Sequence, residues 1–267
     1  MEQMNWIQTL IIAIIEGLTE FLPVSSTGHM IIAQKILNVQ STEFVKAFTV
    51  IIQLGAILSV VVVYRKRFFQ SFAFYRTLFI AFIPAAVFGF ALSDFIDELL
   101  ESVEVVAISL VLGGIIMLFV DKWFNKPVKD QEVTDIKALK IGVAQCIAMI
   151  PGVSRSMATI VGGMGQGLTR RNATEFSFFL AVPTMFAATA YKLLKLMMSS
   201  NSRAVLMENL DILIFGNVVA FIVALITIKF FISYVSKYGF KAFGYYRIIL
   251  GSILLILSFL GINLNIT

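Results

Sequence analysis

Acidic, hydroxyl and imidazole side chains gather in one short stretch near the start of the chain, between Glu16 and His29. Glu16 and Glu20 are four residues apart, which places both carboxyl groups on one face of a helix. Ser26 and Thr27 follow, and His29 is the only histidine in the 267 residues. Hydroxyls and imidazoles can attack phosphorus, and carboxylates can hold a cation or orient a base. The stretch therefore predicts an active site, because a plain capping turn would explain the serines but neither the acids nor the histidine.

A second polar stretch, Pro151 to Ser156, contains a cation that could complement these acids. Arg155 carries a planar guanidinium suited to phosphate oxygens. Its surroundings are apolar, so it requires an anion: a substrate phosphate, or Glu16 or Glu20 across the fold. Gln53 is a weaker candidate, because a polar residue in a helix can simply bond to a neighbouring helix. The candidate substrate-binding residues are Thr27, Gln53, Ser154, Arg155, Ser156 and Thr159.

The composition that surrounds these stretches is that of an integral membrane protein. Hydrophobic residues make up 59% of the chain and charged residues only 14%, whereas soluble domains carry about 25% charged residues. The net charge of +5 is attributed to basic loops, and no nucleic-acid partner is expected. Six apolar segments are long enough to predict transmembrane helices. They cover roughly 44–64, 77–93, 105–120, 174–191, 212–232 and 244–262.

Both polar stretches lie in regions that do not fit this pattern. Residues 6–37 and 137–169 each contain a short apolar arm, a polar break at a proline and another short arm. Neither arm is long enough to span, and irregular backbone at membrane depth must be buried in protein or line a cavity. We therefore predict two re-entrant helical hairpins in an all-α membrane protein.

The chain is predicted to consist of two matching halves. Each half starts with a hairpin and continues with three spanning helices. Pro23 and Pro151 are 128 residues apart, as are Gly55 and Pro183. An odd number of crossings inverts the second copy, and inverted repeats bring broken helices together near the middle of the membrane. We predict one membrane domain over 1–267, with repeat one at 1–121, repeat two at 137–267 and a cytoplasmic connection at about 121–140.

Charges between the segments predict the orientation. Residues 65–76, 121–140 and 229–247 are rich in lysine and arginine, whereas 93–104 holds five acids and no base. The positive-inside rule places the first three in the cytoplasm and both termini outside. The loop at 192–211 is the exception, since its three basic residues would be external. The first hairpin then enters from outside and the second from inside, so their tips should meet.

The two motifs, Glu16-Gly-Leu-Thr-Glu-Phe-Leu-Pro-Val-Ser-Ser-Thr-Gly-His29 and Pro151-Gly-Val-Ser-Arg-Ser156, resemble the signatures of the undecaprenyl-diphosphate phosphatase family of the bacitracin-resistance type. The resemblance extends over the whole chain. It implies a hydrolase of the bacterial inner membrane that converts undecaprenyl diphosphate to the monophosphate, recycling the carrier for peptidoglycan synthesis and conferring bacitracin resistance. It also implies a site that opens to the outer face and a divalent cation, Mg²⁺ or Ca²⁺. The functional residues it implies are Glu16, Glu20, Ser26, Thr27, His29 and Arg155.

Several alternatives stay open from the sequence. Glu16 and Glu20 either hold the cation or orient the base. The favoured nucleophile is Ser26 with His29 as general base and acid, and the alternative is His29 itself through a phosphohistidine. Because broken helices in inverted repeats are typical of transporters, a lipid-phosphate flippase is the alternative function. The oligomeric state is also open, a homodimer included.

Overall fold

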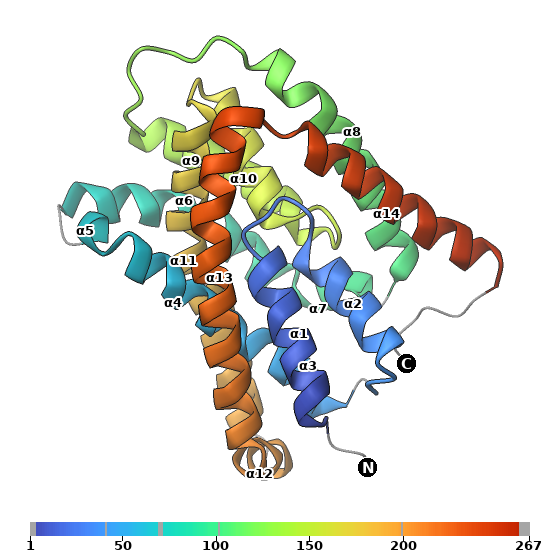
Figure 1. Cartoon of the computed structure of the whole chain (residues 1–267). Coiled ribbons are helices and arrows are strands. Elements are labelled where there is room, and N and C mark those ends of the chain that lie inside the picture. Colours follow the sequence, from blue (N-terminus) through green and yellow to red (C-terminus); the bar gives the residue numbers. More distant parts are fainter. Residues whose placement is uncertain (1–3, 41, 69–71, 101, 199, 262–267) are drawn as a thin grey trace.

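The computed structural model describes residues 4–40, 42–68, 72–100, 102–198 and 200–261 (Figure 1). Regular structure in these ranges is entirely helical. The helices are α1 (Trp6–Thr19), α2 (Ser26–Ile36), α3 (Glu43–Ile51), α4 (Gln53–Val63), α5 (Arg65–Phe68), α6 (Phe72–Ala91), α7 (Ser93–Leu100), α8 (Val103–Trp123), α9 (Asp135–Cys146), the 3₁₀ turn η1 (Ile147–Met149), α10 (Arg155–Gly165), α11 (Arg170–Met197), α12 (Ser200–Glu208), α13 (Leu210–Tyr238) and α14 (Lys241–Phe259).

Six helical segments within the described ranges are long and apolar enough to cross a membrane. They are α3 with α4, α6, α8, α11, α13 and α14, of which α11 and α13 are the longest at 28 and 29 residues. Each contains one of the predicted apolar segments or overlaps it over most of its length. This confirms the six predicted transmembrane helices, and the protein is a multi-pass membrane protein.

Two of the predicted loops contain helices. Residues 93–104 include α7, and residues 192–211 include the end of α11 and all of α12. The predicted boundaries were too short because basic residues such as Lys192 and Lys195 were placed outside the helix, although lysine is a good helix former. These charges extend α11 beyond its apolar part.

Two helix pairs, the first hairpin (α1 and α2) and the second hairpin (α9, η1 and α10), do not reach spanning length. Their α-helices have 14, 11, 12 and 11 residues. At about 1.5 Å per residue the longest is ~21 Å, against a hydrocarbon core of ~30 Å. The arms of each pair pack on one another and are joined by a turn, which agrees with the predicted break at each proline.

The second helix of each hairpin starts in the same unusual way. The N-cap residues Ser25 and Ser154 have φ values of 70° and 76°, a region that residues other than glycine occupy at a cost of ~1–3 kcal/mol. Both hydroxyls accept a hydrogen bond from the amide three residues later, on Gly28 and Met157. The two caps are 129 residues apart, one more than the predicted offset of 128. The helix starts are thus equivalent, whereas Pro23 and Pro151 differ by one position.

The first arm of each hairpin packs against the opposite half of the chain. α1 lies along α13, and α9 lies along α6. The backbones approach closely: a Cβ atom on Gly17 would lie 2.8 Å from the Ala220 carbonyl oxygen, and one on Gly142 would lie 2.2 Å from that of Ala81. These reciprocal contacts fix the two hairpins in one framework.

One acidic residue holds together the helix ends that the charge pattern assigns to the cytoplasm. Asp121, near the end of α8, accepts hydrogen bonds from the Arg170 side chain at 2.6 Å and from the Phe240 amide at 2.8 Å. The start of α11 and the turn between α13 and α14 therefore lie beside the connection between the two halves. Figure 1 shows this end opposite α12 and the N-terminus.

Candidate active site

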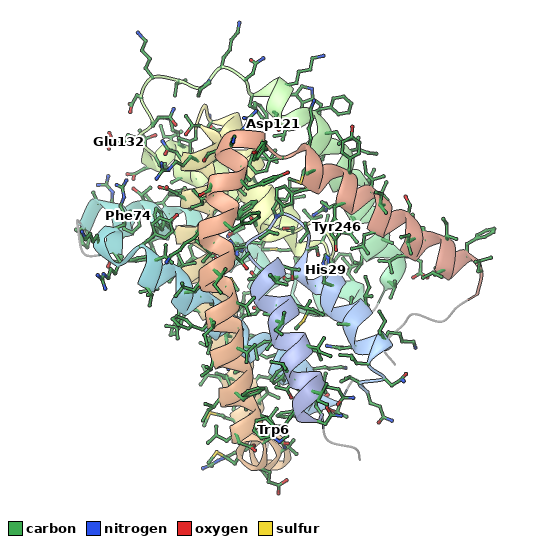
Figure 2. The ribbon with its side chains drawn as sticks, in the orientation of Figure 1. Trp6, His29, Phe74, Asp121, Glu132 and Tyr246 are labelled. Atoms are coloured by element: carbon green, nitrogen blue, oxygen red, sulfur yellow. The ribbon has the colours of Figure 1, made fainter. Side chains whose placement is uncertain are left out.

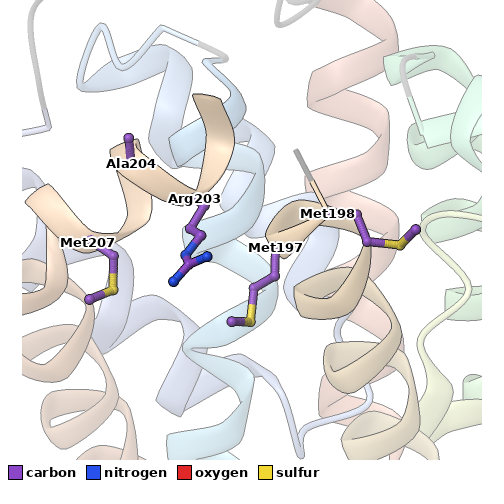
Figure 3. Close-up of a pocket in the computed structure, with 5 residues that line it drawn as sticks. All are labelled: Met197, Met198, Arg203, Ala204 and Met207. Carbon is purple, nitrogen blue, oxygen red and sulfur yellow. The ribbon is translucent and has the colours of Figure 1, made fainter. Parts of the chain in front are cut away.

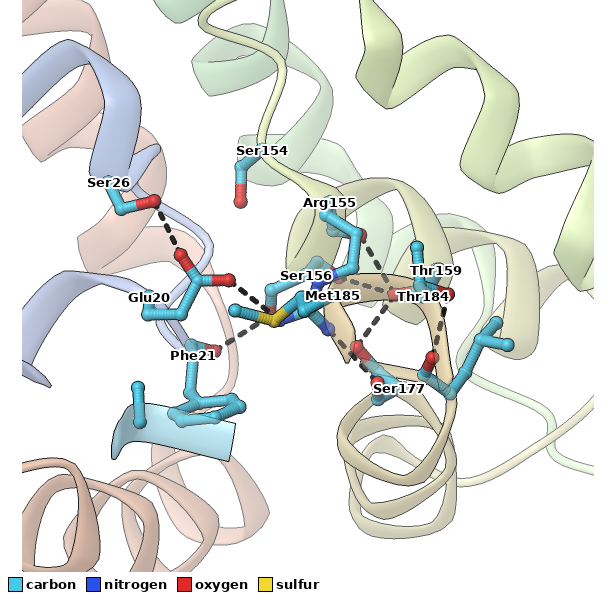
Figure 4. A network of polar contacts seen from close by, with 12 residues as sticks. Glu20, Phe21, Ser26, Ser154, Arg155, Ser156, Thr159, Ser177, Thr184 and Met185 are labelled. Carbon is cyan, nitrogen blue, oxygen red and sulfur yellow. Dashed lines mark hydrogen bonds and ion pairs between the residues drawn. The ribbon is translucent and has the colours of Figure 1, made fainter. Parts of the chain in front are cut away.

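The tips of the two hairpins meet at the carboxylate of Glu20. The Ser26 hydroxyl donates a hydrogen bond of 2.7 Å to Glu20 Oε2, and Arg155 Nη2 lies 3.1 Å from Glu20 Oε1 (Figure 4). Ser26 is the first residue of α2, and Arg155 is the first residue of α10. One buried carboxylate therefore joins a hydroxyl from the first hairpin to a guanidinium from the second.

A second contact ties the two turns together beside this carboxylate. Ser156 is fully buried, and its hydroxyl donates a hydrogen bond of 2.7 Å to the Phe21 carbonyl oxygen. The Phe21 ring lies 5.8 Å from the guanidinium carbon of Arg155 and packs edge-on against Phe178. The start of α10 is thus held against the first turn by both polar and apolar contacts.

The Arg155 guanidinium is aligned by main-chain and side-chain groups of α11. Its Nη1 donates to the Ser177 carbonyl oxygen at 3.0 Å, and its Nη2 lies 3.6 Å from the sulfur of Met185. The Ser177 hydroxyl also bonds to Thr159 at 2.6 Å. Arg155 is fixed in orientation, yet its Nε has no hydrogen-bond partner.

Glu16 supplies a matching unpaired acceptor. It lies one helical turn before Glu20 and is 1% exposed, and its Oε1 has no hydrogen-bond partner. Within the described ranges, this atom and Arg155 Nε are the buried side-chain nitrogen and oxygen atoms without a partner. An unsatisfied buried polar group costs ~1–3 kcal/mol, more if charged. Such unpaired atoms are expected where a ligand supplies the missing bonds. Arg155 Nε can donate to a phosphate oxygen, and Glu16 Oε1 can bind a cation or a proton.

His29 lies on α2 and is held through both ring nitrogens. Nδ1 is 2.7 Å from the Ser25 carbonyl oxygen, and Nε2 is 2.6 Å from the Tyr246 hydroxyl of α14. Figure 2 labels both side chains. The expected contact between His29 and Ser26 is not formed, because the Ser26 hydroxyl is bonded to Glu20 instead. In this arrangement Glu20, rather than His29, is the group placed to accept the serine proton.

Arg247 is a buried arginine, although it lies where the predicted basic region 229–247 overlaps the apolar segment 244–262 and was counted among the cytoplasmic charges. Its side chain is 0% exposed and lies in α14. Pro23 and Gly152, the turn residues that accept from it, are 129 residues apart and thus equivalent in the two hairpins. The carbonyl acceptors and distances are Pro23 at 3.0 Å, Gly152 at 2.8 Å, Ser109 at 3.0 Å and Leu110 at 3.4 Å.

The remaining predicted residues are placed less directly. Ser154 caps α10, and the hydroxyls of Ser156 and Thr159 are bonded within the protein. Thr27 is half-buried in the first turn of α2, and Gln53 is half-buried at the start of α4. Among the described residues, no hydrogen bond links Thr27 or Gln53 to Glu20 or Arg155.

Residues 9–253 match the family model described as bacitracin resistance protein BacA. The chain belongs to this family. A protein of Flavobacterium johnsoniae is 59% identical over 259 residues, which cover 96% of this chain and 97% of that protein. A protein of Porphyromonas gingivalis is 53% identical, covering 98% and 100%, and one of Aquifex aeolicus is 46% identical, covering 91% and 95%. Each of these relatives is named undecaprenyl-diphosphatase.

The BacA-family match includes nearly all of both hairpins as well as Tyr246 and Arg247. These two residues were missed because they lie outside the polar motifs. The available signal was that Arg247 is the one charged residue in the apolar segment 244–262.

Two surface hollows lie away from the hairpin tips. One, of about 500 Å³, is formed by Met197, Met198, Arg203, Ala204 and Met207 at the junction of α11 and α12 (Figure 3). The other, of about 370 Å³, lies between the end of α4, α5 and α13. Neither contains a residue of the Glu20 junction.

Proposed function

We propose that this protein hydrolyses undecaprenyl diphosphate to undecaprenyl phosphate and inorganic phosphate, the activity for which its relatives are named. The observation that carries the proposal is the junction at Glu20. There the Glu20 carboxylate is hydrogen-bonded to a hydroxyl of its own hairpin and to a guanidinium of the other hairpin. A nucleophile, a proton acceptor and a phosphate-binding cation are the groups that phosphoryl transfer requires.

In the first step, Ser26 Oγ attacks the terminal phosphorus and its proton passes to Glu20 Oε2, which already accepts its hydrogen bond. A serine–phosphate bond forms, the bond from the terminal phosphorus to the bridging oxygen breaks, and undecaprenyl phosphate leaves. Arg155 binds the developing charge through its unpaired Nε. The starts of α2 and α10 add partial positive charge, since Ser26 and Arg155 are their first residues.

In the second step, water attacks the phosphoserine and its proton passes to His29. His29 follows Ser26 by three residues on α2, so both side chains lie on neighbouring parts of one helix face. The serine–phosphate bond breaks, Ser26 Oγ recovers the proton held by Glu20, and inorganic phosphate leaves with the proton that His29 had taken. This sequence keeps Ser26 as nucleophile and assigns the two proton acceptors to different steps.

Glu16 would hold the divalent cation, Mg²⁺ or Ca²⁺, which when bound neutralises charge on the phosphate oxygens. Glu20, whose two oxygens accept from Ser26 and Arg155, would act as the base rather than as a ligand. The unpaired Glu16 Oε1 supports this fit. The described residues contain no cluster of three or more potential ligands from His, Cys, Asp and Glu. This agrees with the usual Mg²⁺ arrangement of one or two carboxylates with substrate phosphates.

Glu16→Gln is expected to raise the cation concentration for half-maximal activity by at least about tenfold, because it removes a charged ligand. Metal titrations with Mg²⁺ and Ca²⁺ measure this, with Glu43→Gln on the exposed first turn of α3 as a matched control. If Glu16→Gln reached half-maximal activity at the same cation concentration as the wild type, Glu16 would not be a ligand of the cation.

The proposal also places the hairpins within the membrane as re-entrant units of an inverted repeat. Their sub-spanning length, the equivalent caps Ser25 and Ser154, and the reciprocal packing of α1 on α13 and α9 on α6 support this. The site opens to the outer face of the bacterial inner membrane. The spent carrier is left at that face, its dephosphorylation provides the monophosphate for peptidoglycan synthesis, and removal of the diphosphate confers bacitracin resistance.

The test is release of inorganic phosphate by the purified protein from undecaprenyl diphosphate in detergent. Phosphate release is expected from the wild type and from Ser233→Ala, which alters an exposed serine of α13. Ser26→Ala is expected to lower the rate by about 10³-fold or more through loss of the nucleophile. A trapped intermediate should be acid-stable phosphoserine at position 26. An acid-labile phosphohistidine at position 29 would refute the serine mechanism, and no phosphate release would leave only the transport alternative.

A further inference from the structure

We propose that Tyr246 is a positioning residue of this site, whose hydroxyl holds the His29 ring in place through Nε2, the nitrogen that takes the proton. The inference rests on the proposed function, because it assigns a partner to the histidine used there. Tyr246 belongs to neither motif and is separated from His29 by 217 residues along the chain.

The tautomer follows from the two partners of the ring. The Ser25 carbonyl oxygen can only accept, so Nδ1, at 2.7 Å from it, carries the proton. In the neutral ring Nε2 then holds a lone pair, and the Tyr246 hydroxyl at 2.6 Å donates to it. The bond from Nδ1 to a carbonyl is the arrangement that fixes which histidine nitrogen reacts.

A tyrosine hydroxyl suits this position because it can donate or accept. It donates to Nε2 when His29 is neutral, and it accepts from Nε2–H once His29 has taken a proton. Both protonation states therefore keep a partner without movement of the ring. Tyr246 is 45% exposed, so the hydroxyl stands at the open side of His29 rather than in the closed core.

The backbone around Tyr246 is held firmly by its neighbour. Arg247 is completely buried and bonds to the Pro23 and Gly152 carbonyl oxygens in the two hairpin turns. α14 also packs along α8, where a Cβ on Gly114 would lie 2.8 Å from the Gly244 carbonyl oxygen. The turn of α14 that carries Tyr246 is thus fixed relative to the turn that precedes His29.

The chain offers a matched control one residue away. Tyr245 is 59% exposed on the same helix and lies about 100° around the helix axis from Tyr246. Tyr246→Phe and Tyr245→Phe remove the same hydroxyl group from adjacent positions. A general effect of losing a tyrosine hydroxyl would appear in both variants, whereas a positioning effect on His29 would appear only in the first.

The test is nitrogen NMR of protein labelled at histidine, after removal of any histidine tag. Because His29 is the only histidine, its two ring nitrogens are the only signals. We expect the Nδ1–H tautomer in all three proteins, because its partner is the Ser25 carbonyl oxygen. The chemical shift of Nε2 should change only in Tyr246→Phe, because only this variant removes the hydrogen bond to Nε2. We also expect kcat of Tyr246→Phe to fall about tenfold, with KM little changed, since positioning acts on the chemical step.

Three results would overturn the inference. They are an Nε2–H tautomer in the wild type, an unchanged Nε2 chemical shift in Tyr246→Phe, and an equal loss of kcat in Tyr245→Phe. The wild-type spectrum decides the first even if Tyr246→Phe fails to fold. Full phosphate release by His29→Ala would refute the role of His29 in the proposed function, while leaving the tautomer measurement intact. The two failures are therefore distinguishable.

Discussion

Arg155→Met is expected to lower kcat/KM for undecaprenyl diphosphate by about 10²–10³-fold, the usual effect of removing one preorganised group that stabilises developing charge. The guanidinium is oriented by the Ser177 carbonyl oxygen at 3.0 Å and by Glu20 at 3.1 Å, which leaves its buried Nε unpaired. Steady-state kinetics of phosphate release measure the loss. Arg155→Lys should recover only part of it, because an ammonium lacks the planar fork.

Removal of Arg155 also leaves Glu20 buried without its ion pair, and breaking such a pair can destabilise a protein by ~3–5 kcal/mol. The double variant Arg155→Met with Glu20→Gln removes both charges and controls for this effect. We expect it to recover thermal stability relative to Arg155→Met but to stay inactive. Arg171→Met should retain wild-type kinetics, since Arg171 is exposed and its ion pair is with Glu175, one turn further along α11. Wild-type kcat/KM in a stably folded Arg155→Met would remove Arg155 from the mechanism.

The six spanning helices could be predicted because lipid leaves the backbone few alternatives. Apolar length alone identifies such helices, since every peptide group within the membrane must be bonded internally. The boundaries were less predictable. Lys192 and Lys195 extend α11 beyond its apolar part, and charged ends of this kind do not interrupt a helix.

The meeting of the two hairpins was predictable from charge. An arginine in apolar surroundings needs an anion, and Arg155 finds it in Glu20 of the other hairpin. The detail of which hydroxyl bonds to which acceptor was not predictable. Ser26 and His29 are close in sequence, yet Ser26 donates to Glu20 and His29 bonds to Tyr246. The helix that carries both residues starts at a serine with a positive φ angle, Ser25, and a serine does not predict that conformation.

The role of Arg247 could not be inferred from side-chain patterns, because its acceptors are main-chain carbonyl oxygens. Every residue carries a carbonyl group, so such a partner leaves no trace in the sequence. The arginine beside basic residues of the turn, such as Lys241, therefore resembled another cytoplasmic loop charge. Its complete burial in α14 shows the opposite.

Arg247→Met is expected to destabilise the protein by at least about 2 kcal/mol, because the buried turn carbonyls of Pro23 and Gly152 lose a charged donor and each unsatisfied group costs ~1–3 kcal/mol. Relief of the buried charge offsets part of this loss. For a protein of this size, ~2 kcal/mol corresponds to a fall in Tm of about 4–8 °C. Thermal unfolding in detergent measures it, with Lys241→Met at the exposed start of α14 as the control. A Tm equal to that of the control would contradict the role of Arg247 in holding the two hairpin turns together.

Gly113 allows the position of the guanidinium itself to be tested. A Cβ on Gly113 would lie 2.3 Å from Arg247 Nη2 and 2.9 Å from the Met157 sulfur. Gly113→Ala should therefore lower Tm and phosphatase activity, although alanine favours a helix by about 1 kcal/mol over glycine. Arg247→Met removes the guanidinium, which is the nearest group to the new Cβ. In the double variant, Gly113→Ala should therefore lower Tm much less than it does in the wild type. Additive losses would mean that the two residues act independently. Strong non-additivity would show that the guanidinium fills the space beside Gly113, where it joins α8 to both hairpin turns. Through these contacts it holds the two hairpins so that Ser26 and Arg155 meet on the same carboxylate.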